Sequence, residues 1–190
     1  KQFFNNQIKM QEILENNIYQ GDCFELIKGI PDGTVDCIIT DPPYGTTANK
    51  WDKKFDLVAL WKELYRVAKP NAAFVFTSQM PFIVDLVNSN RKDFRYEWIW
   101  EKCQGTGFLN ANKMPLKIHE QILVFYRKLP TYNPQKWQGK PRSDSRPSNV
   151  ISKNYNFRKT VPYNNPTGLR FPIDIIKCNY EFSLPIFFNP

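Results

Sequence analysis

Apolar residues in the first 128 positions follow two spacings, one typical of strands and one typical of helices. Short, nearly continuous apolar runs predict buried strands, because a strand covered on both faces carries apolar side chains at most positions. Runs in which apolar residues recur every three or four positions predict amphipathic helices. The predicted strands are residues 18–20, 35–40, 72–78, 94–102 and 119–128, and the predicted helices are residues 23–30, 55–70 and 81–90.

Segment 55–70 has the clearest helical pattern. A proline at position 70 predicts its end, since proline cannot continue a helix. The apolar stripe of this helix consists of Leu57, Trp61, Leu64 and Ala68.

Strands that alternate with helices along the chain predict an α/β fold with a mostly parallel, doubly wound sheet. In such sheets, ligands bind beyond the carboxyl ends of the strands. The tetrapeptide Asp41-Pro42-Pro43-Tyr44 directly follows the predicted strand 35–40. Its position alone makes it a candidate site.

Charge is distributed unevenly along the chain. Residues 1–101 contain 12 Lys and Arg against 14 Asp and Glu, whereas residues 102–170 contain 13 against 2. From about residue 129 the chain is also rich in Pro, Asn and Tyr, with no clear period. This concentration of the net charge of +8 favours binding to a polyanion. A solvated basic loop region is the alternative explanation.

Composition argues against several classes of protein. The chain has no apolar run of about 18 residues, so we expect no membrane span, and its first residues predict no secretory signal. Its four cysteines are widely spaced and it has one histidine, His119, so we expect no metal site. Reduced thiols in a cytoplasmic protein are the simplest interpretation.

The tetrapeptide at 41–44 suits methyl transfer to an exocyclic amine of a nucleic-acid base. Such a nitrogen is a poor nucleophile because its lone pair is delocalised into the ring. Hydrogen-bond acceptors on its N–H groups help it to pyramidalise, and Asp41 and the carbonyl of Pro42 can supply them. The ring of Tyr44 offers a surface on which an extruded base can stack.

These residues resemble a known family. The motif "DPPY" is similar to the catalytic motif of β-group DNA amino-methyltransferases, which use S-adenosylmethionine. The segments "YQGDCFELIKGIPDGTVDCIITDPPYG", "ANKWD", "RVAKPNAAFVFTSQMPF", "WIWEKCQGTGFLNANKMPLKIHEQILVFYRK" and "RFPIDIIK" resemble its blocks in order. The resemblance covers residues 17–130 and 168–177 and implies a Rossmann-like methyltransferase fold. Asp at the first motif position resembles adenine-N6 enzymes more than cytosine-N4 enzymes.

The resemblance also implies roles for individual residues. The catalytic motif that binds the target adenine would be Asp41, Pro42, Pro43 and Tyr44. The residues near S-adenosylmethionine would be Asp22, Cys23 and Asp41. The contacts to double-stranded DNA would come from Lys102, Lys136, Lys140, Arg142 and Arg146. Residues 1–128 would form part of the catalytic domain, 129–170 a basic target-recognition region and 171–190 a C-terminal tail.

Each role has a structural alternative. Asp41 could cap the end of a strand, and Tyr44 could serve packing. Asp22 could cap the helix that follows it. Lys102 could be a solvated charge. For Trp51 and Asp52 we expect a role in ordering the loop rather than in contacting DNA.

The β group also has a glycine-rich "FxGxG" loop that cradles the methionine end of the cofactor, and this sequence contains none. Without the strands of that half, a central strand would become an open edge. We therefore expect the chain to be a truncated remnant, a fragment that a second chain completes, or an incomplete piece, with weak stability or self-association. Cytosine-N4 methylation and a non-catalytic DNA-binding remnant are the alternative functions.

Overall fold

The computed structural model describes residues 16–53, 56–143, 151–152, 158–159 and 164–177. The chain divides into two compact units. The first contains the described residues up to Thr131 together with those from Ile175 onward, and the second contains those of Tyr132–Asp174. Each unit is described by itself.

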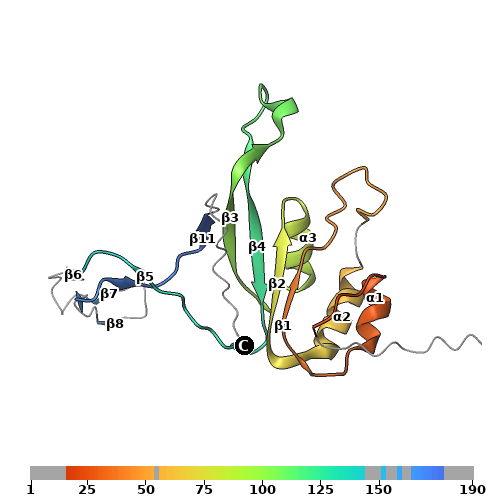
Figure 1. The fold of residues 1–190 in the computed structure, drawn as a ribbon, viewed down its shortest axis with the longest axis horizontal. Coiled ribbons are helices and arrows are strands. Elements are labelled where there is room, and N and C mark those ends of the chain that lie inside the picture. The colour runs from red at the N-terminus through yellow and green to blue at the C-terminus, as the bar shows by residue number, and fades with distance from the viewer. Residues whose placement is uncertain (1–15, 54–55, 144–150, 153–157, 160–163, 178–190) are drawn as a thin grey trace, which may run out of the picture. The chain divides into compact units, whose positions relative to one another are not determined.

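A five-stranded mixed sheet forms the centre of the first unit (Figure 1). Its order is β1-β2-β4-β3-β11. Strands β1 and β2 are parallel, as are β3 and β11, whereas β4 runs antiparallel to both of its neighbours. Four of the five strands therefore point the same way, as predicted. Their bounds are β1 Val35–Thr40, β2 Ala68–Ser78, β3 Phe94–Thr106, β4 Lys117–Phe125 and β11 Ile175–Lys177.

Two helices cover one face of this sheet. They are α2 (Leu57–Val67) and α3 (Phe82–Ser89), and their apolar sides pack on β2 and β4. Trp61 of α2 is central to this core, because its ring meets the rings of Phe74, Phe76 and Phe125 at centroid distances of 5.6, 5.3 and 5.1 Å. Its indole N–H donates to Ser89 Oγ over 2.8 Å, which ties α2 to α3.

The predicted helix 55–70 begins later and ends earlier than its pattern suggests. Asp56 accepts hydrogen bonds from the first turn of α2 and fixes its start. The helix ends at Val67, and Ala68, predicted on its stripe, is already the first residue of β2. The predicted helix 23–30 is one α-helical turn, α1 (Cys23–Leu26), followed by the 3₁₀ turn η1 (Ile27–Gly29).

The strand predicted at residues 18–20 is wrong, because this segment has no strand structure and Ile18 is fully exposed. A strand needs a hydrogen-bonded neighbour, and β1 pairs only with β2 among the described strands. As an edge strand, β1 is also less buried than its apolar sequence predicts. Ile39 in its middle is 64% exposed.

Strands β3 and β4 extend beyond their neighbours as a two-stranded arm (Figure 1). Phe94 pairs with Phe125, and after a register shift regular pairing runs from Tyr96–Val124 to Glu101–His119. After a second shift, Thr106 pairs with Lys117. The tip of this arm contains the short 3₁₀ helix η2 (Phe108–Asn110).

The second unit contains three two-stranded antiparallel ladders among its described residues. Strands of two residues are too short to produce a hydrophobic period, which explains why the sequence shows none here. The pairs are β5 (Trp137–Gln138) with β10 (Leu169–Arg170), β6 (Arg142–Ser143) with β9 (Asn164–Asn165), and β7 (Ile151–Ser152) with β8 (Arg158–Lys159).

Candidate active site

The carboxyl end of β1 holds a carboxylate that two hydroxyl groups orient. Asp41 is exposed and follows the last residue of β1. Tyr44 Oη donates to Asp41 Oδ1 over 2.6 Å, and Thr77 Oγ1 donates to the same oxygen over 2.5 Å. Both donors use Oδ1, and Oδ2 accepts no hydrogen bond from the part of the chain that the structure describes. The carboxylate therefore has a fixed orientation and one available acceptor oxygen.

Tyr44 is anchored in the core of the first unit. Its ring stacks on Phe82 of α3, with 5.5 Å between centroids and 30° between planes. Burial raises the pKa of the Tyr44 phenol, and the hydrogen bond to Asp41 raises it further. The phenol therefore stays protonated and donates to Asp41. Phe82 already contacts the ring, so packing, the structural alternative for Tyr44, is part of its role.

The two prolines shape the end of β1. Neither Pro42 nor Pro43 has an N–H, so neither can donate to a neighbouring strand. Pro42 is buried and Pro43 is half-buried. The prolines therefore end strand pairing at the point where Asp41 is presented.

Asp52 orders the loop that follows the motif, as predicted. Its carboxylate is 7% exposed and accepts from the backbone N–H groups of Gly45, Thr46 and Thr47 over 2.6, 2.9 and 2.6 Å. The hydrogen bond from the Thr47 side-chain hydroxyl lowers the pKa of Asp52 most, and the three backbone N–H donors lower it further. Gly45 has a φ of 66°, a conformation that favours glycine. Trp51, by contrast, is 71% exposed.

Two lysines of the β3–β4 arm lie at the end of the sheet that carries the motif. Lys117 Nζ donates to Gln79 Oε1 over 2.6 Å, and Gln79 Nε2 donates to Thr46 Oγ1 over 3.4 Å. Burial lowers the pKa of the Lys117 ammonium. Lys102 forms an ion pair with Glu120. The arm is therefore tied to the loop beyond the motif.

Lys102 was predicted to contact DNA, and its surroundings are now defined. Besides its ion pair with Glu120, its ammonium lies over the ring of Trp100, 5.0 Å from the centroid. Much of its charge is therefore balanced within the protein. Its contact with DNA stays a prediction.

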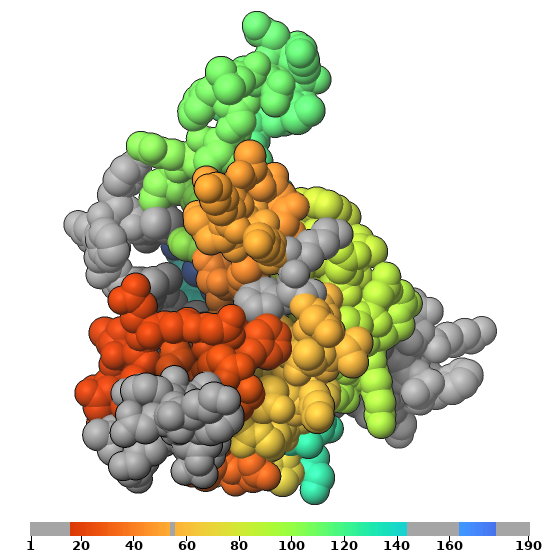
Figure 2. Space-filling model, turned by 90° about the vertical axis from the view of Figure 1, so that its right-hand side faces the viewer, coloured from red at the N-terminus to blue at the C-terminus, as the bar shows by residue number. Residues whose placement is uncertain are grey.

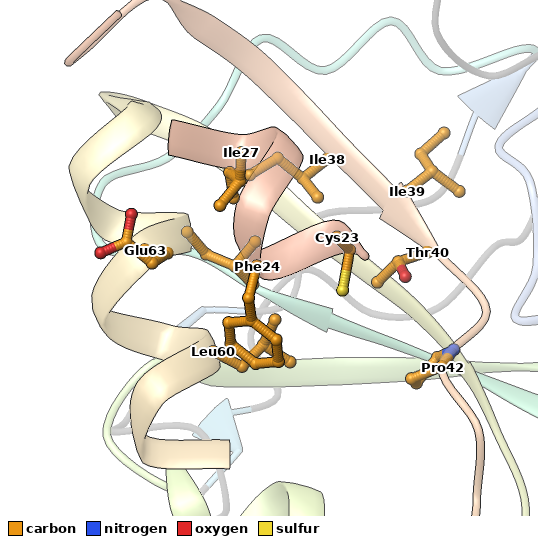
Figure 3. A pocket seen from close by; sticks show the side chains of 10 residues that line it. Cys23, Phe24, Ile27, Ile38, Ile39, Thr40, Pro42, Leu60 and Glu63 are labelled. Atoms are coloured by element: carbon orange, nitrogen blue, oxygen red, sulfur yellow. The ribbon is translucent and has the colours of Figure 1, made fainter. Parts of the chain in front are cut away.

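An apolar pocket lies between α1, β1 and α2 and has a volume of about 250 Å³ (Figure 3). Its wall includes Cys23 and Phe24 from α1, Ile38 and Thr40 from β1, and Pro42. Figure 3 shows Pro42 beside Thr40 at the strand end, with Cys23 opposite from α1. Burial raises the pKa of the Cys23 thiol, so this side chain is a neutral thiol at pH 7.

Asp22, predicted to bind cofactor, caps α1. Its Oδ1 accepts from the backbone N–H of Phe24 over 2.8 Å and from that of Glu25 over 3.4 Å. This is the structural alternative that the sequence left open. A role for the other carboxylate oxygen stays a prediction.

The predicted DNA-contacting residues of the second unit that the structure describes are exposed. They are Lys136, Lys140 and Arg142, whereas Arg146 lies outside the described residues. Lys136 lies over the ring of Phe171 at 4.4 Å, and Arg170 lies over Trp137 at 5.4 Å.

Sequence reasoning missed several residues around the motif, namely Thr77, Gln79, Lys117 and Glu120. Thr77 lies near the end of β2, the strand next to β1. Neighbouring parallel strands end at the same edge, a rule that could have found Thr77. Lys117 and Glu120 arrive at this edge because β4 is antiparallel, which the sequence pattern does not reveal.

Within the described ranges, no group of three or more His, Cys, Asp or Glu side chains could hold a metal ion. No helix in this part of the chain is long and apolar enough to cross a membrane.

A family model described as DNA methylase, N6_N4_Mtase, matches residues 35–176. The chain belongs to this DNA methylase family. It is 28% identical over 152 residues to the type II methyltransferase M.BglII of Bacillus subtilis. That match covers 66% of this chain and 41% of M.BglII. The chain therefore spans less than half the length of this relative.

The fold is also similar to solved methyltransferase structures. The cytosine-N4-specific PvuII DNA methyltransferase matches with a TM-score of 0.51 and 14% identity, over 88% of this chain and 58% of that one. The complex of M1.HpyAVI with SAM matches with a TM-score of 0.49 and 22% identity, over 64% and 61%. The PvuII match confirms the predicted methyltransferase fold.

Proposed function

We propose that this chain carries the base-binding part of a DNA methyltransferase that methylates adenine at N6 with S-adenosylmethionine. The observation that carries this proposal is the carboxylate of Asp41. It stands at the carboxyl end of β1 with Oδ1 held by Tyr44 and Thr77. An oriented acceptor at the ligand-binding edge of an α/β sheet suits an amine that must be activated.

Asp41 and Pro42 would each accept one hydrogen bond from the amine. Asp41 Oδ2 accepts a hydrogen bond from one N–H of adenine N6, and the carbonyl of Pro42 accepts from the other. The nitrogen thereby gains electron density and can pyramidalise. The S–CH3 bond of the cofactor would break as the methyl group bonds to N6, leaving neutral S-adenosylhomocysteine, and the nitrogen would lose one proton to solvent beside the exposed Asp41. Tyr44 and Thr77 hold the carboxylate throughout.

The pocket between α1 and β1 fits part of the proposed cofactor. S-adenosylmethionine supplies an electrophilic methyl group when it is bound. The lining of Cys23, Phe24, Ile38 and Pro42 suits a flat purine ring. Among the described lining residues the charged one is Glu63, which is paired with Arg66 over 2.8 Å. These residues fit the adenine end of the cofactor and offer no partner for its charged amino-acid end.

Product analysis tests this proposal. The chain is incubated with unmethylated duplex DNA and S-adenosylmethionine carrying a labelled methyl group, and the DNA is digested to nucleosides. We expect the label in N6-methyladenine. Label in N4-methylcytosine would overturn the choice of base. DNA binding without label, and without binding of S-adenosylmethionine in calorimetry, would identify a non-catalytic DNA-binding remnant instead.

A further inference from the structure

The arm formed by β3 and β4 presents apolar side chains at its tip. Phe108 is 68% exposed, Leu109 is 100% exposed and Met114 is 58% exposed. Figure 2 shows the arm, in green, projecting beyond the body of the first unit. Three large apolar side chains gathered on a projecting turn are unusual on a soluble surface and indicate a contact site.

The tip is a built turn. Gly107 has a φ of 90°, which lets the chain leave β3 and enter η2. The backbone N–H of Asn110 donates to the carbonyl of Gly107 over 2.9 Å, and those of Lys113 and Met114 donate to the carbonyl of Asn110 over 2.8 and 3.0 Å. These hydrogen bonds fix the backbone from which the apolar side chains project.

The charge around the tip favours a polyanion. Between Glu101 and Glu120 the arm contains three lysines, one histidine and no acidic residue, and one of these lysines, Lys102, is paired with Glu120. The base of the arm is tied through Lys117 and Gln79 to Thr46 in the loop beyond the DPPY motif. The tip therefore carries Lys113 and no acidic side chain, and the base of the arm lies at the same edge of the sheet as Asp41.

A second copy of the chain fits this surface less well than a nucleic acid does. A stable interface between proteins buries roughly 800 Å² on each partner, which three side chains cannot supply. Proteins that deform a duplex, by contrast, insert Phe, Leu or Met between base steps while basic residues bind the phosphates.

We propose that Phe108, Leu109 and Met114 form a wedge that enters the DNA duplex and fills the space that an extruded base leaves. This proposal rests on the proposed function, because a base bound at Asp41 must leave the stack. The fully exposed Leu109 is the leading side chain of the wedge. Lys113, from the same turn, would contact a phosphate.

A comparison of two duplexes tests the wedge in the full chain. One duplex is intact, and the other carries a single abasic site, where the space for the wedge already exists. Unstacking a base costs a few kcal/mol. We therefore expect the wild-type chain to bind the abasic duplex about tenfold or more tightly. Leu109→Ala should reduce this ratio at least threefold, whereas Leu129→Ala, which truncates another exposed leucine (75%), should leave it unchanged.

The outcomes separate the wedge from the proposed function. Failure of the wild-type chain to bind either duplex would contradict both. Equal binding of the two duplexes, or an unchanged ratio in Leu109→Ala, would overturn the wedge alone. Loss of a dimer in sedimentation by Leu109→Ala, with the ratio unchanged, would assign the tip to an interface between copies and also overturn the wedge.

Discussion

Replacement of Thr77 by valine tests whether orientation of Asp41 matters for methyl transfer. Valine has the shape of threonine and lacks the hydroxyl that donates to Asp41 Oδ1 over 2.5 Å. Tyr44 still donates to the same oxygen over 2.6 Å, so the carboxylate keeps one of its two hydrogen-bond donors. The variant therefore weakens the orientation of Asp41 and keeps the rest of the site in place.

The expected fall in the rate of methyl transfer follows from the loss of the hydrogen bond between Thr77 and Asp41. A hydrogen bond to a charged group contributes about 1.5–3 kcal/mol. If half or more of this is expressed in the transition state, the rate falls roughly 3–100-fold, since about 1.4 kcal/mol is tenfold. Thr77→Ser keeps the hydroxyl and should retain most of the rate.

The assay is the single-turnover rate of methyl transfer to DNA, with thermal unfolding measured alongside. We expect Thr77→Val to be slow, Thr77→Ser to be close to wild type, and both to unfold near the wild-type temperature. A valine variant as fast as the wild-type chain would show that Asp41 needs no orientation by Thr77.

Three further predictions concern the loop, the core and the second unit. Asp52→Asn should lower the unfolding temperature at pH 7. The folded pKa of Asp52 lies below its unfolded value of about 3.9. The difference in unfolding temperature between variant and wild type should therefore persist above about pH 3.9 and vanish as pH falls through the folded pKa. A difference in unfolding temperature that is independent of pH would refute this. Trp61→Ala should cost about 3–5 kcal/mol of unfolding free energy in urea, and a loss below about 1 would contradict its central place in the core. Lys136→Ala and Arg142→Ala should each reduce the slope of log affinity for DNA against log salt by about 1, and unchanged slopes would argue against phosphate contacts by the second unit.

Much of the first unit was predictable from sequence, because each local pattern agrees with the final packing. The apolar stripe of 57–67 packs as α2, and the run at 72–78 lies within a central strand with neighbours on both sides. The absence of a strand at residues 18–20 was not predictable from composition alone. Its apolar residues have strand character, but strand structure depends on a neighbour that local sequence does not reveal.

The candidate site was predictable at its first residue and less so around it. Asp41 follows from the rule that ligands bind at the carboxyl ends of strands. One partner of Asp41, Tyr44, is close in sequence, but the other, Thr77, lies 36 residues away on β2, so that contact depends on strand order. Asp22 shows the opposite case. Its position before α1 suits a helix cap, and local hydrogen bonds decide its conformation.

The most direct test of the central claim compares the wild-type chain with Asp41→Ala in methylation and DNA binding together. We expect labelled N6-methyladenine from the wild-type chain and none from the variant. The two DNA affinities should lie within a few fold of each other, because Asp41 acts on the amine and contributes little to holding the duplex. Substantial methyl transfer by Asp41→Ala would show that the oriented carboxylate at the end of β1 is not the acceptor for the amine.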